Sequence, residues 1–264
     1  MKKSPIFITI CLAGAGLGST FANADTLEVI SSGGFYSSME KLIPIFEKQT
    51  GHTVHLSSGS SMGESPTAIP NRLNRGERFD IVVLAAPELS KLAEKGYVDP
   101  SSQSALVNSS IGMAVPKGAP KPDISSAAKF EKVLLNAKHI GYSASASGTH
   151  LEKDVFPSFP PVEYKVISSK AEKVVGDRVA KRIAEGQFDI GFQQISEIKP
   201  FTGKYGQVEL VGPIPAPYQK VTVFAAGIGK NSQHAKVAKE LIQFVKSPQA
   251  TQIIEEQGLE QVKQ

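Results

Sequence analysis

The stretch Phe79-Asp-Ile-Val-Val-Leu-Ala85 decides the fold. A continuous apolar run of this length is typical of a parallel strand that is buried on both faces. Before it, the residue spacing predicts a strand, a helix, a second strand and a second helix, at 26–31, 39–46, 53–57 and 69–73. A further helix is expected at 87–96. This alternation predicts an α/β fold with an open sheet and helices on both faces.

The second half of the chain repeats this alternation. We expect strands at 111–115, 139–142, 164–167, 188–192, 208–211 and 221–228. We expect helices around 130–137, 149–156, 175–183, 237–245 and 253–254. Two such modules predict two lobes, each a mainly parallel sheet flanked by helices, with crossovers at 111–115 and 221–228. The expected division is 25–110 plus 222–264 for lobe I and 111–221 for lobe II.

The first residues have the features of a secretion signal. Lys2 and Lys3 precede an apolar run at 6–18, and Ala22-Asn23-Ala24 is a small-x-small cleavage site. We therefore expect residues 1–24 to be removed and the mature protein to be periplasmic. The apolar run is too short to span a bilayer, and no later segment is long enough, so no membrane insertion is expected. Cys11 is the only cysteine and lies in this segment, so no disulfide is expected.

Composition favours a globular protein with a small ligand. Hydrophobic residues make up 41% of the chain and charged residues 20%, which is ordinary for a globular domain. The formal net charge is +4, and +2 without Lys2 and Lys3. No basic stripe is interleaved with aromatic residues, so nucleic acid is not an expected partner. The weak positive balance suits a small anionic ligand.

Three loops rich in serine and glycine follow predicted strands and open helices. They are 31–35, 57–63 and 143–149. Free backbone N–H groups at a helix start form a natural anion site, although serine and glycine are also ordinary caps and turn formers. None of the loops matches a phosphate fingerprint. The candidate ligand-binding residues are Gly33, Gly34, Ser60, Ser61, Met62, Ser145, Ser147, Gly148 and Thr149.

A few side chains outside these loops are further candidates. Arg72 shares a helix face with Arg75, and arginine suits bidentate capture of a carboxylate, although both could be solvated surface residues. Gln193 and Gln194 end a predicted strand and could bind a ligand or cap the sheet edge. No HExxH motif or cysteine cluster is present, so no metal site is expected. We expect Ser60, Ser147 and Gln194 to face a common hollow.

Several segments resemble the molybdate-binding-protein-like group of type II periplasmic binding proteins. They are F-E-K-Q-T-G at 46–51, S-S-G-S-S at 57–61, G-E-R-F-D-I-V-V-L at 76–84, L-A-E-K-G-Y-V at 92–98 and I-A-E-G-Q-F-D-I-G-F at 183–192. The resemblance spans almost the whole mature chain. It implies two α/β lobes, joined by two crossovers, that close over an oxyanion.

The ligand residues of that group transfer poorly. Its first-loop serine falls on Gly34, its tyrosine falls on Gln194, and only the second-loop serine is kept, at Ser60 or Ser61. The loop after Ser61 is also longer. A pocket that loses two hydroxyls and gains length implies a different and larger ligand than molybdate.

A divergent branch with G-S-S-M-G at 59–63, A-I-P-N-R-L at 68–73, Y-S-A-S-A-S-G at 142–148, G-F-Q-Q-I-S-E at 191–197 and V-G-P-I-P at 211–215 is similar to the periplasmic aconitate isomerases. This resemblance implies cis/trans isomerisation of a tricarboxylate by an allylic proton shift, with no metal or organic cofactor. The carboxylates would bind at the serine-rich helix starts and at Arg72 or Arg75. The candidates for moving the proton are His150, Glu197, Tyr142 and Glu64.

The same residues also fit a non-catalytic alternative. The same scaffold serves as the solute receptor of an ABC importer, which binds a small anion and docks on a membrane permease. Such a receptor needs no base in its cleft. We expect a monomer in either case.

Overall fold

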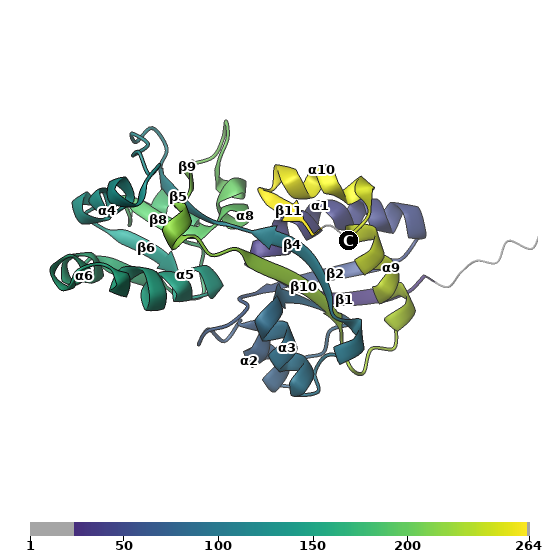
Figure 1. Ribbon diagram of the computed structural model, residues 1–264. Helices are drawn as coiled ribbons and strands as arrows, with labels where there is room; N and C mark the ends of the chain where they lie inside the picture. The colour runs from purple at the N-terminus through teal and green to yellow at the C-terminus, as the bar shows by residue number, and fades with distance from the viewer. Residues whose placement is uncertain (1–23, 263–264) are drawn as a thin grey trace, which may run out of the picture.

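The computed structural model describes residues 24–262. The predicted signal segment therefore lies outside the described residues, except for Ala24. The chain forms two β-sheets with flanking helices, and Figure 1 shows them as two lobes joined by a pair of extended segments. The two-lobed α/β architecture predicted from the sequence is confirmed. Each sheet is mixed rather than mainly parallel, because the strands next to the crossovers run antiparallel to their neighbours.

Lobe I is built on the six-stranded sheet, in the order β11-β4-β10-β3-β1-β2. Its first part contains β1 (Thr26–Ser32), α1 (Gly33–Thr50), β2 (Thr53–Gly59), α2 (Ile69–Asn74), β3 (Ile81–Ala85), α3 (Ala86–Glu94) and β4 (Ser104–Ser109). The chain returns to it with β10 (Thr222–Ile228), α9 (Ala235–Val245), α10 (Pro248–Glu256) and β11 (Leu259–Gln261). Strands β1, β2 and β3 are parallel, so their carboxyl ends meet at one edge, which faces lobe II.

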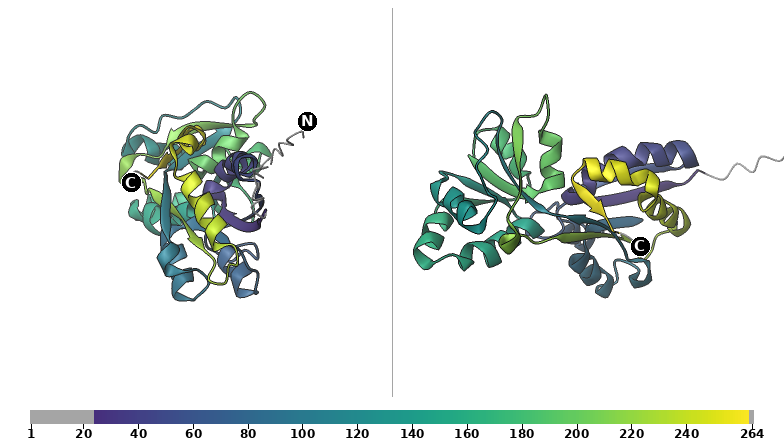
Figure 2. Two further views of the ribbon diagram at one scale, coloured as in Figure 1. Left: turned by 90° about the vertical axis from the view of Figure 1, so that its right-hand side faces the viewer. Right: turned by 45° about the horizontal axis from the view of Figure 1, so that its top comes forward.

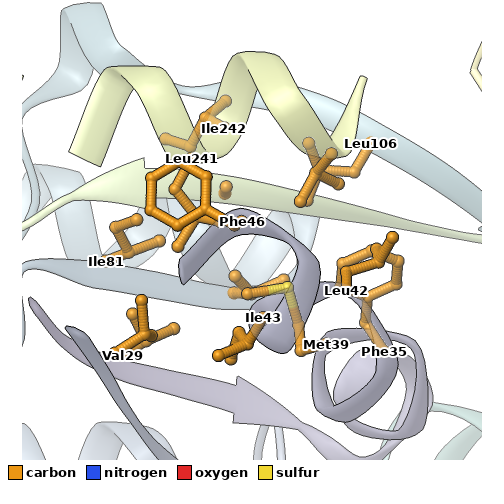
Figure 3. Packing of buried hydrophobic residues seen from close by; sticks show 14 of the residues in the cluster. Val29, Phe35, Met39, Leu42, Ile43, Phe46, Ile81, Leu106, Leu241 and Ile242 are labelled. Carbon is orange, nitrogen blue, oxygen red and sulfur yellow. The ribbon is translucent and has the colours of Figure 1, made fainter. Parts of the chain in front are cut away.

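The main core of lobe I lies between this sheet and helices α1, α9 and α10. Helix α1 buries Phe35, Met39, Leu42 and Phe46 at helical spacing, against strand residues and the inner face of α9. Figure 3 shows these side chains packed with Leu241 and Ile242 of α9. A second core cluster on the other face of the sheet is covered by α2 and α3. The start of α1 is thereby fixed at the lobe boundary.

Lobe II is built on the five-stranded sheet, in the order β7-β6-β8-β5-β9. Its elements are β5 (Ile111–Pro116), α4 (Ala127–Asn136), β6 (Ile140–Ser143), α5 (Ala146–His150), α6 (Pro161–Ser168), β7 (Ala171–Val174), α7 (Val179–Ala184), β8 (Ile190–Gln194), α8 (Ile195–Ile198) and β9 (Val208–Pro213). Short helical turns follow α5 and α8, at Leu151–Ser158 and Lys199–Phe201. The parallel strands β6, β7 and β8 end toward lobe I (Figure 2).

One predicted strand is wrong. Residues 164–167 belong to helix α6, which starts at Pro161, a favoured first helical residue. The helix buries Ile167 and leaves Val162 and Val166 exposed. These exposed apolar residues extend the apolar pattern beyond the buried face, and the pattern was therefore interpreted as a strand. The strand of this region is β7, whose Glu172 and Lys173 are exposed on the sheet edge. The helix expected from residue 175 consequently begins later, at Val179.

The two crossovers run from β4 to β5 and from β9 to β10, and two glutamines bridge them. The Gln194 side chain accepts a hydrogen bond from Ser109 Oγ (2.7 Å) and donates one to Thr222 Oγ1 (3.0 Å). Gln219 accepts from the Ile111 N–H at 2.8 Å and donates to the Ile111 carbonyl at 2.9 Å. Both crossovers are thus fixed to each other. In the part of the chain that the structure describes, no helix meets the length and apolarity needed to cross a bilayer.

Candidate functional site

A cleft of about 330 Å³ lies between the lobes, where the carboxyl ends of β1, β2, β6, β7 and β8 converge. Open α/β sheets place ligands at such strand ends. Lobe I contributes Gly33, Ser58, Gly59, Ser60, Met62, Gly63, Ser65 and Thr67, and lobe II contributes Ser143, Ala144, Ser145, Val174, Gly176, Asp177, Arg178, Gln193 and Glu197. The volume is at the small end of ligand pockets, which suits a small polar molecule.

The start of helix α1 forms one wall of the cleft. Gly33 is the first residue of this 18-residue helix, and its backbone lines the cleft. Ser32 caps the helix in an extended conformation, but its side chain makes no capping hydrogen bond, and its buried Oγ has no partner among the described residues. The free N–H groups of a first helical turn, with the positive end of the helix dipole, favour a negatively charged ligand here.

Glu197 is placed in the cleft by the short helix α8. Gln194 precedes that helix and Glu197 is its third residue, the spacing of a capping box, and the Glu197 carboxylate accepts the Gln194 backbone N–H. The Gln193 side chain donates a second hydrogen bond. A Cβ added at Gly33 would overlap Glu197 Oε1, so a larger residue at this position would displace the carboxylate. The adjacent Ser196 Oγ donates to the Gly34 carbonyl at 2.6 Å and joins the lobes.

Burial raises the pKa of Glu197 to about 7, although the positive charge of Arg178 and the two hydrogen bonds act to lower it. A carboxyl group with this pKa exchanges a proton readily near neutral pH, which is the property of a general base or acid. Glu197 therefore combines position in the cleft with suitable acid–base chemistry.

Arg178 is the cation that sequence reasoning missed. It precedes α7 and is half-buried, and of the described residues that line the cleft it alone has a cationic side chain. It lies in Val175-Gly-Asp-Arg178, a stretch without a recognisable motif, directly after the strand that the sequence analysis misplaced. A correct assignment of β7 would have put this arginine at a strand end, where ligand residues are expected.

Asp177, the neighbouring cleft residue, is not a comparable acid–base group. Burial acts to raise its pKa, but hydrogen bonds from the Arg178 backbone N–H and from Lys181 outweigh this effect, so the Asp177 pKa is lowered. Its carboxylate also pairs with Arg182, at 3.0 Å. Asp177 is thus held as an ionised carboxylate by cations on α7.

The loop between β2 and α2 spans the cleft and contacts lobe II. Ser60 Oγ donates to the Met62 carbonyl at 2.8 Å, which shapes the loop. Gly63 has a φ of 102°, a left-handed conformation that favours glycine, and a Cβ there would lie 2.8 Å from the Ala144 carbonyl oxygen. Thr149 Oγ1 lies 3.4 Å from Met62 Sδ. These contacts join the two lobes over the cleft.

Six of the predicted site residues line the cleft: Gly33, Ser60, Met62, Ser145, Gln193 and Glu197. Gln193 Oε1 also accepts a hydrogen bond from the Ala180 N–H at the start of α7. This hydrogen bond orients the Gln193 amide so that its NH₂ group points toward Glu197.

Four predicted loop residues are buried behind the cleft. Ser61 Oγ accepts the Ala85 N–H at 3.1 Å. Ser147 Oγ is hydrogen-bonded to Ser143 Oγ at 2.9 Å, and the Gly148 N–H donates to the same oxygen. Gly34 packs on the Phe224 ring. These four residues hold the loops in shape, and other residues of the same loops, among them Gly33, Ser60 and Ser145, line the cleft.

Arg72 and Gln194 point elsewhere. Arg72 pairs with Glu77 at 2.7 Å and donates to the Ser58 carbonyl, so it supports the β2 end without lining the cleft. Gln194 is engaged at the crossovers, because successive strand residues face opposite sides and Gln193 occupies the cleft side. The expected common hollow for Ser60, Ser147 and Gln194 is therefore wrong: of the three, Ser60 alone lines the cleft.

His150 and Thr149 line a second cavity, of about 620 Å³, beyond the Met62–Thr149 contact. His150 Nδ1 lies 2.8 Å from Asp154, and Nε2 lies 3.0 Å from the Tyr218 carbonyl oxygen. Both ring nitrogens of His150 are thus engaged, outside the serine-rich cleft.

The other two proton-transfer candidates also lie outside the cleft lining. Tyr142 is buried in the lobe II core, where burial and the charge of Glu152 raise its pKa to about 12. Glu64 is exposed on the β2–α2 loop. Within residues 24–262, no three His, Asp or Glu side chains are grouped as metal ligands.

Two α/β lobes, two crossovers and a donor-lined cleft between them define the class of periplasmic-type binding proteins. A family model described as bacterial extracellular solute-binding protein matches residues 27–260, and the chain belongs to this family.

Known relatives fall into enzyme and receptor groups. The chain is 39% identical over 237 residues to an aconitate isomerase of Pseudomonas sp.. The aligned region covers 90% of this chain and 88% of the relative. It is 25% identical over 269 residues to a putative ABC transporter substrate-binding lipoprotein of Bacillus subtilis, covering 97% and 98%. The Azotobacter vinelandii periplasmic molybdate-binding protein has a similar structure, with a TM-score of 0.68, 24% identity and coverage of 90% and 100%. This last likeness concerns the fold alone.

Proposed function

We propose that this protein is an aconitate isomerase that interconverts cis- and trans-aconitate in the cleft between its lobes. The observation on which the proposal rests is Glu197, a buried carboxyl group with a pKa near neutrality that faces the cleft beside Arg178. The 39% identity to an aconitate isomerase over most of both chains supports it.

The cleft contains the groups that this substrate class requires. Its lining offers serine hydroxyls, the N-terminus of α1 and the Arg178 guanidinium to the carboxylates of a tricarboxylate. We assign ligand binding to Gly33, Ser60, Ser145, Gln193 and Arg178, with Met62 contacting the ligand from the β2–α2 loop.

The reaction moves one proton from one carbon to another in two transfers, the first to Glu197 and the second from it. The Glu197 carboxylate takes a proton from the CH₂ group, and the electron pair of the broken C–H bond spreads over the adjacent carboxylate and the double bond. The proton then returns to the other end of this allylic system, and the double bond forms in its new position. Rotation about the carbon–carbon bond before the transfer decides whether the product is cis or trans. No oxidant or reductant is consumed.

A passive receptor for a multiply charged anion does not require a carboxyl group that titrates near neutral pH, whereas an isomerase requires a group that can take and return a proton. Donors alone would suffice for binding. The presence of Glu197 in the lining therefore favours catalysis.

Solute reception for an ABC importer is the second candidate. The match to a putative ABC transporter substrate-binding lipoprotein favours it. In that case a membrane permease would be the partner of the closed lobes. In both cases we propose a monomer that is exported through a cleaved signal at 1–24 and works in the periplasm.

The test is to incubate the purified mature chain with trans-aconitate and to separate the products by chromatography. Appearance of cis-aconitate at a rate proportional to protein concentration supports the isomerase. Tight binding of an anion in a thermal-shift panel without any conversion refutes the isomerase and favours the receptor.

A further inference from the structure

Arg178 has a guanidinium that the protein leaves without a carboxylate partner. Among residues 24–262, no Asp or Glu oxygen lies within 4.0 Å of it. The adjacent Asp177 pairs instead with Lys181 and Arg182, at 3.1 and 3.0 Å. A half-buried arginine that lines a cleft and lacks an ion-pair partner is available to bind an anion.

Two aromatic rings orient this guanidinium. Tyr36 lies in the first turn of α1, in lobe I, and Phe201 follows α8, in lobe II. The centroid of each ring is 6.0 Å from the Arg178 guanidinium carbon. Contact with an aromatic face holds a guanidinium without using its N–H donors. Burial and then the charge of Glu40 raise the pKa of Tyr36, while Arg178 lowers it, so the ring that faces Arg178 is a neutral phenol.

We infer that Arg178 determines specificity and stabilises the reacting charge by binding the carboxylate attached to the carbon that gives its proton to Glu197. This inference rests on the proposed isomerase function and deepens it. The substrate class is an acid with a carboxylate on the allylic CH₂ carbon.

The choice of carboxylate follows from the placement of the two side chains. Arg178 and Glu197 line the same cleft, and the charge of Arg178 is close enough to act on the Glu197 carboxyl group. The carboxylate bonded to the carbon that contacts Glu197 is attached directly to the reacting centre, so we assign this carboxylate to Arg178. When the C–H bond breaks, negative charge grows on that carboxylate, and a fixed guanidinium then binds it more strongly than in the ground state.

The position of Tyr36 connects Arg178 to the opposite lobe. Helix α1 belongs to lobe I and Arg178 to lobe II, so the Tyr36–Arg178 contact is made between the lobes, as is the Ser196–Gly34 hydrogen bond.

The experiment measures kcat and KM for trans-aconitate with the full mature chain and with R178Q, R178K, Y36L and Y36F. R75K is the matched control, because Arg75 lies on the lobe I surface, pairs with Glu77 and does not line the cleft. We expect R178Q to lower kcat about 10²-fold, with a much smaller change in KM, as for loss of a transition-state donor. R178K should recover only part of this loss, since a lysine lacks the planar fork. Y36L should lower kcat and Y36F should not, since phenylalanine keeps the ring.

The possible results separate the inference from the proposed function. An inactive wild-type protein would refute the function and the inference together. An active wild type with R178Q changed only in KM, or unchanged, would overturn the inference and leave the isomerase intact. If R178Q does not fold, Y36L and Y36F decide: equal kcat values for these two variants would overturn the inference, and a loss confined to Y36L supports it.

Discussion

Glu197→Gln separates the charge of this side chain from its packing. Glutamine has the same shape and keeps the capping box with the Gln194 N–H, since either Glu or Gln serves at this position. The change therefore removes the titration of Glu197 with little disturbance of α8. A matched control is E255Q, an exposed glutamate on α10, far from the cleft lining.

The size of the effect follows from the pKa. The Glu197 pKa rises from 4.5 to about 7 on folding. Because the folded state holds the proton more tightly, this group favours folding below pH 4.5, and its contribution is lost as the pH rises through about 7. The shift of about 2.5 units corresponds to about 3 kcal/mol of unfolding free energy.

Urea unfolding of the wild type and E197Q measures this effect directly. We expect the free energy of unfolding of E197Q minus that of wild type to be about 3 kcal/mol higher at about pH 8 than at about pH 4, because the wild type alone loses stability over this range. E255Q should show no such difference. Activity on trans-aconitate should fall about 10²–10⁴-fold in E197Q, the usual contribution of a general base. An equal stability change at both pH values would refute the assignment of a raised pKa, and undiminished activity would refute the assignment of the base.

Three further outcomes follow from the same geometry. The kcat/KM of the wild type should rise with pH through about 7 and then level off, because Glu197 must be ionised to take the proton; a flat profile between about pH 5 and 8 would exclude it as the base. Gly33→Ala places a Cβ against Glu197 Oε1, so it should lower the free energy of unfolding by about 1–3 kcal/mol and lower kcat. A wild-type unfolding free energy together with a wild-type kcat would contradict the close approach of Gly33 to Glu197. His150→Gln loses contacts with Asp154 and Tyr218, so it should cost about 1–2 kcal/mol in stability but far less activity than E197Q; a loss of activity equal to that of E197Q would return His150 to the reaction.

The fold was largely predictable because hydrophobic periodicity reflects burial. The run at 79–85 became β3, and the striped helices became α1 and α9, with their apolar faces in the core. Prediction was wrong at 164–167, where apolar residues lie on an exposed helix face, and it omitted the edge strand β11 and its neighbour β4. Local patterns do not encode which partly polar segments pair at sheet edges.

The site was predictable at the level of loops and less so at the level of atoms. Serine-rich strand ends did converge, as in the lining by Ser60 and Ser145. Adjacent strand residues face opposite ways, however, so the sequence could not decide between Gln193 and Gln194. Nor could it show that Ser145 precedes α5 and lines the cleft while Ser147 lies inside α5, bonded to Ser143. The contact of Gly33 with Glu197, and of Tyr36 with Arg178, joins distant segments from two lobes, and such pairs have no local sequence signature.

The most direct measurement is proton NMR of trans-aconitate mixed with the mature protein, recorded in parallel for wild type and E197Q. We expect growth of cis-aconitate signals with the wild type and none above background with E197Q. Unchanged trans-aconitate in the presence of wild-type protein that demonstrably binds it would contradict the proposal that this cleft is an active site.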